Sequence, residues 1–370
     1  MKYYIISGEA SGDLHGANLI KELMKLDPAA NIRCWGGDMM EAAGAKVVKH
    51  YKELAFMGFK EVIANIGTIL NNIRFCKKDI IQFNPDVVVF IDYPGFNLRL
   101  SKFAKQKGFK TLYYIAPQVW AWKEGRVEII KKYIDTLLVI LPFEVDFFAK
   151  HQCPAIFTGH PLLDAVSTFE INTNFYIQNK LDPQTPIIAL LPGSRKQEIL
   201  KMLPVMCETT KNFEGYQFVI AAAPGQTLDF YQEIIYNYPN IKIVSGQTYQ
   251  LLKHSYAACV TSGTATLETA LFNVPQVVCY KGSWFSYQIG RRLVKVKYIS
   301  LVNLILDKPC VSELIQDGFT VETLSDELQD ILSETREEML EDYLDLKGML
   351  GNGGASKKAA DAVFALATKK

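Results

Sequence analysis

Short apolar runs alternate with segments of helical periodicity along most of this chain. In the first half, the runs are residues 3–6, 32–35, 87–91, 111–115, 137–141 and 155–157. A second series of the same character covers residues 187–191, 218–222, 241–244, 257–260 and 276–280. Strands that alternate with helices in this way form a parallel sheet with helices on both faces. The pattern therefore predicts an α/β protein with two consecutive open, Rossmann-like sheets.

A polar segment rich in turn-forming residues separates the two series. It follows Asp164 and contains Asp-Pro at 182–183 and Thr-Pro at 185–186. A chain of 370 residues is long enough for about two domains, each with its own core. We therefore place a first domain at residues 1–168 and a second at residues 169–345.

The end of the chain is helical and charged. A glycine-rich break at residues 351–354 precedes a final helical pattern at residues 355–368. We expect residues 346–370 to return to the first domain and pack on it.

Composition and charge narrow the classes of partner. The chain has 40 basic and 39 acidic residues, so its net charge is +1 and no global field attracts nucleic acid. Its seven cysteines include no C-x-x-C pair and no secretory leader precedes the first strand, which favours free thiols in the cytoplasm. The longest apolar runs are well short of the ~20 residues that span a bilayer. Attraction to a membrane must then come from a local patch.

A glycine-rich turn at residues 7–13 directly follows the first strand and opens a helix. Its glycines allow a ligand to approach the backbone closely, but their spacing is not that of a dinucleotide-binding loop. The carboxylates of Glu9 and Asp13 would repel a pyrophosphate, so the turn suits recognition of hydroxyl groups. Both acids are candidate catalytic residues. The alternative is a turn that only packs the helix on the strand. The candidate contacts to a hydroxylated substrate in this turn are Ser11 and Gly12.

Asp92 directly follows the strand at residues 87–91. Ligands of open parallel sheets bind beyond the carboxyl ends of the strands. A carboxylate there, partly desolvated by the turn Tyr-Pro-Gly-Phe-Asn that follows, is suited to act as a general base. An aspartate that caps the next helix is the alternative.

Aromatic and polar side chains follow the next strands. Residues 116–122 read Ala-Pro-Gln-Val-Trp-Ala-Trp. Aromatic faces suit sugar rings, although tryptophan is equally frequent in cores where its N–H group has a partner. A lone histidine after the last strand of the first domain is more often structural. The candidates for contact with a sugar acceptor are Gln118, Trp120 and His160.

Two turns of the second domain are suited to bind a diphosphate. Arg195 lies in a Pro-Gly-Ser-Arg turn at a helix start, where N–H groups, the helix dipole and a guanidinium favour an anion. A second turn with hydroxyls and a glycine starts another helix, and Glu268, one turn inside, could hold a ribose. An ordinary capping box explains the Thr-to-Glu spacing as well. The other diphosphate candidates are Gly193, Ser194, Ser262, Gly263 and Thr264.

Metal ligands do not cluster in this sequence. The five histidines are scattered, and the pair Glu144 and Asp146 lies in an apolar context typical of a helix start. We therefore expect a site without a metal or another cofactor.

Two segments indicate an apolar partner. Residues 282–306 contain no acidic residue and interleave basic with aromatic side chains, as in helices that lie on anionic lipid. An exposed face of a normal helix is the alternative. Residues 56–73 combine an apolar loop with a helical stripe, which is ordinarily core. The candidate lipid contacts are Phe56, Met57, Phe59, Ile66, Leu70, Trp284, Arg291, Arg292 and Lys295.

Taken in order, four motifs resemble the lipid-A-disaccharide synthase family: residues 7–13, 119–122, 191–195 and 262–265. Further matching stretches lie at residues 54–58, 141–144, 158–160 and 300–304, so the resemblance covers nearly the whole chain. It implies a GT-B glycosyltransferase, with two Rossmann-like domains facing a cleft and C-terminal helices that pack back on the first domain. The implied reaction is inverting and independent of metal.

The implied substrates are UDP-2,3-diacylglucosamine and 2,3-diacylglucosamine 1-phosphate, which yield a β-1,6-linked disaccharide 1-phosphate and UDP. The resemblance assigns Asp92 as the base and Arg195 to the donor phosphate, and it places Asn303 near the donor site. It also implies a peripheral location on the inner face of the inner membrane of a Gram-negative bacterium, and it is compatible with a homodimer. Gly95 stands where the family often has a second acid, and Pro-Gln at 117–118 replaces a commoner Pro-Ser.

Other functions share this fold, because a fold alone does not determine an activity. The alternatives are a UDP-N-acetylglucosamine 2-epimerase, another UDP-sugar enzyme of the GT-B type, and a non-catalytic nucleotide- or lipid-binding protein. Asp92 beside a turn with two acids favours an enzyme, since binding alone does not need that arrangement.

Overall fold

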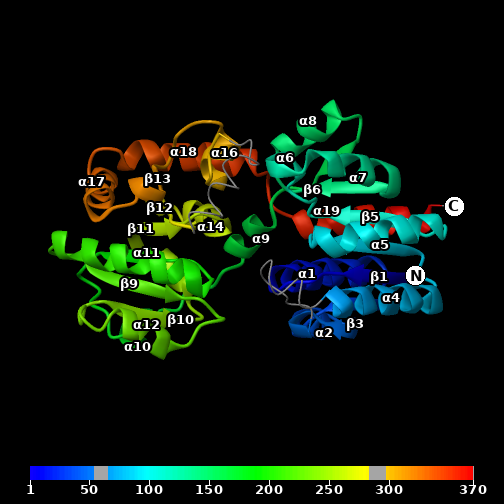
Figure 1. The fold of residues 1–370 in the computed structure, drawn as a ribbon, viewed down its shortest axis with the longest axis horizontal. Helices are drawn as coiled ribbons and strands as arrows, with labels where there is room; N and C mark the ends of the chain where they lie inside the picture. The colour runs from blue at the N-terminus through cyan, green and yellow to red at the C-terminus, as the bar shows by residue number, and fades with distance from the viewer. Residues whose placement is uncertain (54–65, 283–296, 370) are drawn as a thin grey trace. The chain divides into compact units, whose positions relative to one another are not determined.

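The computed structural model describes residues 1–53, 66–282 and 297–369. The chain forms two compact units (Figure 1). Unit 1 comprises Met1–Asp164 together with Leu350–Lys370, and unit 2 comprises Ala165–Met349. The sequence-based boundaries at residues 168 and 346 are close to these positions.

Unit 1 contains a seven-stranded parallel sheet in the order β3-β2-β1-β4-β5-β6-β7. Its strands are β1 (Lys2–Ile6), β2 (Asn31–Gly36), β3 (Lys46–His50), β4 (Val87–Ile91), β5 (Lys110–Tyr114), β6 (Thr136–Val139) and β7 (Ala155–Phe157). β4 reads Val-Val-Val-Phe-Ile and is buried throughout, as expected for a central strand that is covered on both faces.

Helices cover both faces of this sheet (Figure 1). The helices of this unit are α1 (Ala10–Leu26), α2 (Asp38–Ala42), α4 (Ile66–Phe83), α5 (Pro94–Gln106), α6 (Val119–Trp122), α7 (Val127–Tyr133), α8 (Phe143–Lys150) and α19 (Ala355–Thr368). A further helix, α9 (Pro161–Ser167), begins in unit 1 and ends in unit 2. Two 3₁₀ turns complete the described part of the unit, at Tyr51–Glu53 and Glu124–Arg126.

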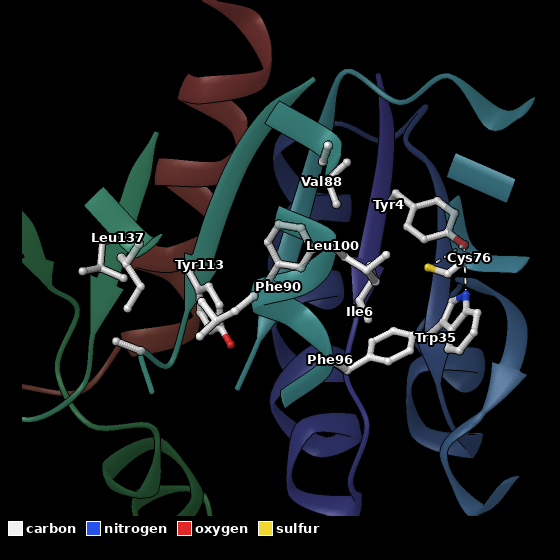
Figure 2. Packing of buried hydrophobic residues seen from close by; sticks show 14 of the residues in the cluster. Tyr4, Ile6, Trp35, Cys76, Val88, Phe90, Phe96, Leu100, Tyr113 and Leu137 are labelled. Carbon is white, nitrogen blue, oxygen red and sulfur yellow. Dashed lines mark hydrogen bonds between the residues drawn. The ribbon is translucent and has the colours of Figure 1, made fainter. Parts of the chain in front are cut away.

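The alternation of side chains along β1 builds a separate core on each face of the sheet. Tyr4 and Ile6 point to one side, where they pack with Trp35 and Phe90 (Figure 2). Tyr3 and Ile5 point to the other side, where α1 and the alanine-rich face of α19 cover them. The C-terminal helix is therefore part of the core of unit 1.

Unit 2 contains a six-stranded parallel sheet in the order β10-β9-β8-β11-β12-β13. Its strands are β8 (Ile187–Leu191), β9 (Gln217–Ala222), β10 (Lys242–Ser245), β11 (Ser255–Thr261), β12 (Gln276–Tyr280) and β13 (Glu313–Ile315). Its helices are α10 (Phe175–Gln178), α11 (Lys196–Thr209), α12 (Leu228–Ile234), α13 (Thr248–His254), α14 (Thr264–Leu271), α16 (Leu301–Leu306), α17 (Val321–Leu332) and α18 (Arg336–Met349), with 3₁₀ turns at Thr210–Asn212 and Gln316–Gly318.

The predicted fold class, two open parallel sheets with helices on both faces, is confirmed. Two strands, β3 and β13, lie outside the predicted set. β3 reads Lys-Val-Val-Lys-His and β13 has only three residues, and each forms an edge of its sheet. Edge strands are commonly short or charged, so a search for apolar runs passes over them.

Candidate active site

The two turns that carry the predicted acids of unit 1 lie at the carboxyl ends of adjacent strands. β1 and β4 are paired, with Ile6 opposite Phe90, so the turn after Ile6 lies beside the turn that starts at Asp92. The backbone of Ser7 continues the sheet by donating to the carbonyl of Trp35 at 2.9 Å. This position beyond a parallel sheet is where the sequence predicts a ligand to bind.

Asp92 and Tyr93 both have left-handed backbone conformations, with φ values of 41° and 49°. Residues other than glycine avoid this region, and such strain is typical of functional sites. Burial raises the pKa of Asp92 to about 6, and the nearby charge of Glu9 adds to the increase. A carboxyl group with this pKa is suited to accept a proton near neutral pH.

Glu9 lies close enough to Asp92 for its charge to raise the pKa of Asp92. It is exposed and precedes the first residue of α1. Burial first, and then the charge of Glu9, also raises the pKa of Tyr93. One exposed carboxylate therefore acts on both residues of the strained turn.

Asp13 is buried, and its carboxylate accepts three backbone hydrogen bonds. Oδ1 accepts from the N–H groups of Gly37 at 2.7 Å and Met40 at 3.1 Å, and Oδ2 accepts from that of Met39 at 3.1 Å. Asp13 therefore fixes the turn between β2 and α2. Its sequence neighbours gave no sign of this structural role.

The other two candidates of the glycine-rich turn differ in exposure. Ser11 is exposed on the first turn of α1. Gly12 is buried, and an added Cβ atom would be 2.8 Å from Cβ of Ser7. The glycine at position 12 is thus required for close packing of the helix on the strand end, which was the alternative interpretation of this turn.

Trp120 is held by a buried glutamate that the sequence analysis had placed only at a helix start. The indole N–H donates to Oε1 of Glu144 at 3.1 Å, and the ring packs edge-to-face on Phe143 with centroids 4.9 Å apart. Oε2 of Glu144 accepts from the N–H groups of Leu141 at 3.0 Å and Ile140 at 3.3 Å. Burial nevertheless raises the pKa of Glu144 to about 7. Gln118, on the same segment, is exposed.

His160 is buried, and its Nδ1 accepts from the N–H group of Leu162 at 3.2 Å. Burial, with a smaller effect of His15, lowers the pKa of His160 to about 3. The ring is therefore neutral near pH 7, and it would contribute no charge to a phosphate.

In unit 2, Arg195 lies at the N-terminus of α11 and is 70% exposed. Its guanidinium pairs with Glu198 one turn later, at 2.7 Å. Gly193 has a φ of 110°, and an added Cβ atom there would lie 3.1 Å from Glu198. Ser194 is exposed beside it.

The second turn of unit 2 lies beside the first, because β8 and β11 are paired with Leu191 opposite Val260. Gly263, with a φ of 146°, precedes α14, and Thr264 is exposed on its first turn. The hydroxyl of Ser262 donates to the carbonyl of Ile299 at 2.8 Å.

Glu268 and Asn303 are engaged inside unit 2. Glu268 accepts from the hydroxyl of Tyr249 at 2.9 Å, and burial raises its pKa. Asn303 is buried and donates to the carbonyl of Val311 at 2.8 Å and to Glu313 at 3.0 Å. Glu313, which the sequence analysis missed, also accepts from the backbone N–H groups at 299 and 300.

Most of the predicted lipid contacts lie outside the described residues, namely Phe56, Met57, Phe59, Trp284, Arg291, Arg292 and Lys295. Ile66 is the first residue of α4, and Leu70 on the same helix is 48% exposed. In the described part of the chain, no helix is long and apolar enough to cross a membrane. The same residues hold no group of three potential metal ligands.

A sequence profile of the family "Lipid-A-disaccharide synthetase" matches residues 3–365. The chain belongs to this lipid-A-disaccharide synthase family. Similar members include the lipid-A-disaccharide synthase of Geobacter metallireducens, 38% identical over 373 residues, with 99% of this chain and 97% of the relative covered. That of Coxiella burnetii is 37% identical over 368 residues, with 98% and 97% covered. The motifs had indicated this family and its function, and both are confirmed.

Solved structures with similar folds include two kinds of enzyme. The UDP-GlcNAc 2-epimerase from Neisseria meningitidis, bound to UDP-GlcNAc, has a TM-score of 0.70 at 14% identity, with 99% of this chain and 100% of that chain covered. The glycosyltransferase of kitacinnamycin has a TM-score of 0.69 at 13% identity, with 99% and 98% covered. At these identities the epimerases show the fold alone, and lipid-A-disaccharide synthases are the relatives by sequence.

Proposed function

We propose that this glycosyltransferase joins 2,3-diacylglucosamine from its UDP-linked donor to 2,3-diacylglucosamine 1-phosphate by direct, inverting displacement. The 6-hydroxyl oxygen of the acceptor bonds to C1 of the donor sugar while the bond from C1 to the diphosphate oxygen breaks. The hydroxyl proton passes to Asp92, and UDP leaves with the electron pair of the broken bond. The product is a β-1,6-linked disaccharide 1-phosphate.

The observation that carries the proposal is the carboxyl group of Asp92. It lies in a strained turn at the carboxyl end of β4, and its pKa of about 6 leaves it ionised at neutral pH yet basic enough to accept a proton. The adjacent Glu9 is exposed and available to an acceptor hydroxyl, together with Ser11 on the first turn of α1. Asp13, by contrast, is engaged with the turn between β2 and α2 through its three backbone partners.

We assign binding of the UDP-linked donor to the two adjacent turns of unit 2. Arg195 and the N–H groups at the starts of α11 and α14, where no N-cap side chain makes a capping hydrogen bond, would bind the diphosphate of UDP. Negative charge grows on that diphosphate as the bond to C1 breaks, and fixed cations and dipoles stabilise it most effectively at that moment. The proposal assigns this stabilisation to protein groups rather than to a metal ion.

The acyl chains of both substrates place the reaction at a membrane surface. We propose peripheral attachment on the cytoplasmic face through the acid-free segment at residues 282–306, with the exposed Leu70 on α4 as a further apolar contact.

The decisive experiment compares wild-type protein with Asp92→Asn in the presence of both substrates, with disaccharide and UDP followed by mass spectrometry. Turnover of the variant should fall ~10²-fold or more, while UDP binding measured by calorimetry stays unchanged. Asp86→Asn is the matched control, because Asp86 lies next to the opposite end of β4 and its carboxylate accepts from the backbone N–H group of Lys2 at 2.7 Å. Disaccharide formation by Asp92→Asn at the rate of this control would refute Asp92 as the base.

A further inference from the structure

The left-handed conformations of Asp92 and Tyr93 need an external restraint, because neither residue is a glycine. The next residue is Pro94, which starts α5 and has no N–H group to share. The backbone supplies part of this restraint: the N–H group of Asp92 donates to the carbonyl of Tyr114 at 3.2 Å, and the carbonyl of Tyr93 accepts from the N–H group of Asn97 at 3.0 Å. Two side chains add to it at the carbonyl oxygen of Asp92.

The first is Asn97, which is completely buried in the first turns of α5. Its Nδ2 lies 2.8 Å from the carbonyl oxygen of Asp92, 3.2 Å from that of Ile91 and 3.3 Å from that of Ile6. These carbonyls are the last groups of β1 and β4 and the first of the strained turn. One side-chain amide thus ties both strand ends to the turn that carries the base.

The second is Tyr113 on β5, the strand next to β4. Its hydroxyl donates to the same carbonyl oxygen of Asp92 at 2.5 Å. Its ring packs in the core beside Phe90, with centroids 5.9 Å apart (Figure 2). This packing fixes the position of the hydroxyl group. Burial and the nearby charge of Asp92 both raise the pKa of Tyr113, which keeps the hydroxyl protonated as a donor.

We propose that Asn97 and Tyr113 are positioning residues, which converge on the carbonyl oxygen of Asp92 and thereby fix the direction of its carboxyl group. This inference rests on the proposed function, in which Asp92 is the base. With both donors in place, the carbonyl oxygen of Asp92 is held from two sides, and the backbone that carries the carboxyl group keeps its left-handed conformation. Loss of a donor lets the peptide relax and gives the carboxyl group more water.

Tyr113→Phe tests this inference, because it removes one oxygen and keeps the ring. Tyr114→Phe is the matched control: it removes a buried hydroxyl from the next residue of β5, but on the opposite face of the sheet. We expect Tyr113→Phe to lower kcat on the order of 10- to 100-fold, as small displacements of reacting groups do, and to leave UDP binding unchanged. Tyr114→Phe should behave like wild type.

The pH profile separates positioning from a merely structural role. Besides burial, the charge of Glu9, from the turn after β1, raises the pKa of Asp92, and the backbone N–H group of Tyr93 lowers it. On β5, the pKa of Tyr113 is raised by burial and the charge of Asp92 and lowered by the charge of Arg126. Better hydration of Asp92 would lower its pKa, so the acid limb of kcat/KM should move to lower pH in Tyr113→Phe. Equal rates for Tyr113→Phe and Tyr114→Phe, or an unmoved acid limb, would overturn the inference.

A second variant, and a measurement of the Asp92 pKa without substrate, distinguish the positioning role from the proposed function itself. Asn97→Ala should change kcat and the acid limb in the same direction as Tyr113→Phe. Titration of the Asp92 carboxyl by carbon-13 NMR, assigned with Asp92→Asn, should show a lower pKa in Tyr113→Phe than in Tyr114→Phe without any substrate. Wild-type protein that forms no disaccharide would refute the proposed function, whereas an identical titration in the two Phe variants would refute the positioning role.

Discussion

The ring of Tyr93 lies directly on the backbone of Gly8, where an added Cβ atom would be only 2.4 Å from the ring atom Cδ1. This contact joins the turn after β1 to the turn after β4 and brings Glu9 to the side of Asp92. A side chain at position 8 would push the ring away, and the strained turn would have to move with it.

We predict that Gly8→Ala lowers turnover at least roughly tenfold, because displacement of the turn misaligns the base. Donor binding should be unaffected, since Arg195 belongs to unit 2. Gly95→Ala is the control: Gly95 lies two residues beyond Tyr93, and an added Cβ atom would meet nothing within 4 Å. Steady-state rates of the two variants, with circular dichroism as a check on folding, measure the difference. Equal activity in both would contradict the contact.

The rate should depend on the protonation of Asp92. Its pKa is raised to about 6, so the carboxyl group loses its basic form as the pH falls below that value. We predict that kcat/KM falls roughly tenfold per pH unit below the midpoint. Glu9→Gln removes a negative charge that raises this pKa, so its acid limb should lie at lower pH than that of wild type. A midpoint at or above the wild-type value would show that Glu9 does not act on the base.

Much of the fold and part of the site follow from local sequence. The apolar runs located eleven strands, and a carboxylate directly after the run at 87–91 identified Asp92 as a candidate base. The glycine turn before Arg195 likewise predicted that a helix starts there, and α11 does start at the next residue. Both predictions of site residues rest on general rules: parallel sheets place ligands at the carboxyl ends of their strands, and helix N-termini favour anions.

The supporting residues could not be predicted, because their partners are distant in sequence. Asp13 accepts from a turn 24 to 27 residues away, and Glu144 meets Trp120 across 24 residues. Tyr113 meets Asp92 across 21 residues, on a backbone that is left-handed at 92 and 93. No periodicity in the sequence signals such a conformation in residues other than glycine.

Arg195 should determine the affinity for UDP. The contact of a charged donor with phosphate typically contributes about 1.5–3 kcal/mol, so Arg195→Ala should weaken UDP binding by that amount in calorimetry. Lys211→Ala is the control, because Lys211 follows α11 at its other end and is also paired with a glutamate, Glu208.

Wild-type protein tests whether the reaction is independent of a metal ion. Addition of EDTA should leave the rate unchanged, because the proposal assigns charge stabilisation to Arg195 and the helix N-termini. Loss of activity in EDTA, with recovery on addition of magnesium, would instead assign that task to a cation.

Glu144 should report its protonation through Trp120. Its pKa is raised to about 7, so the acceptor of the indole N–H becomes charged as the pH rises through neutrality. We predict a change in tryptophan emission with a midpoint near this pH, absent from Trp120→Phe and Glu144→Gln. Trp35→Phe should keep it, because Trp35 donates to the hydroxyl of Tyr4. Ionisation of a buried carboxyl opposes folding, so the free energy of unfolding should also decrease as the pH rises from the ordinary pKa of 4.5 to about 7.

The basic, acid-free segment should attach the protein reversibly to anionic membranes. Its cations are Arg291, Arg292, Lys295 and Lys297, and each basic residue near an anionic leaflet contributes ~1 kcal/mol. We predict that wild-type protein sediments with vesicles that contain an anionic phospholipid, and that moderate salt weakens this binding through screening.

A variant with Gln at those four positions should lose most of this binding. The control carries the same change of charge on the described surface of unit 1, with Gln at Lys102, Lys107, Lys131 and Lys132. If net charge alone drove attachment, the two variants would bind equally weakly, because both have lost four cations. If the acid-free segment is the membrane contact, the control variant should keep its binding and the segment variant should lose it. Aromatic residues that can enter the interface, such as Trp284, accompany the cations of the acid-free segment.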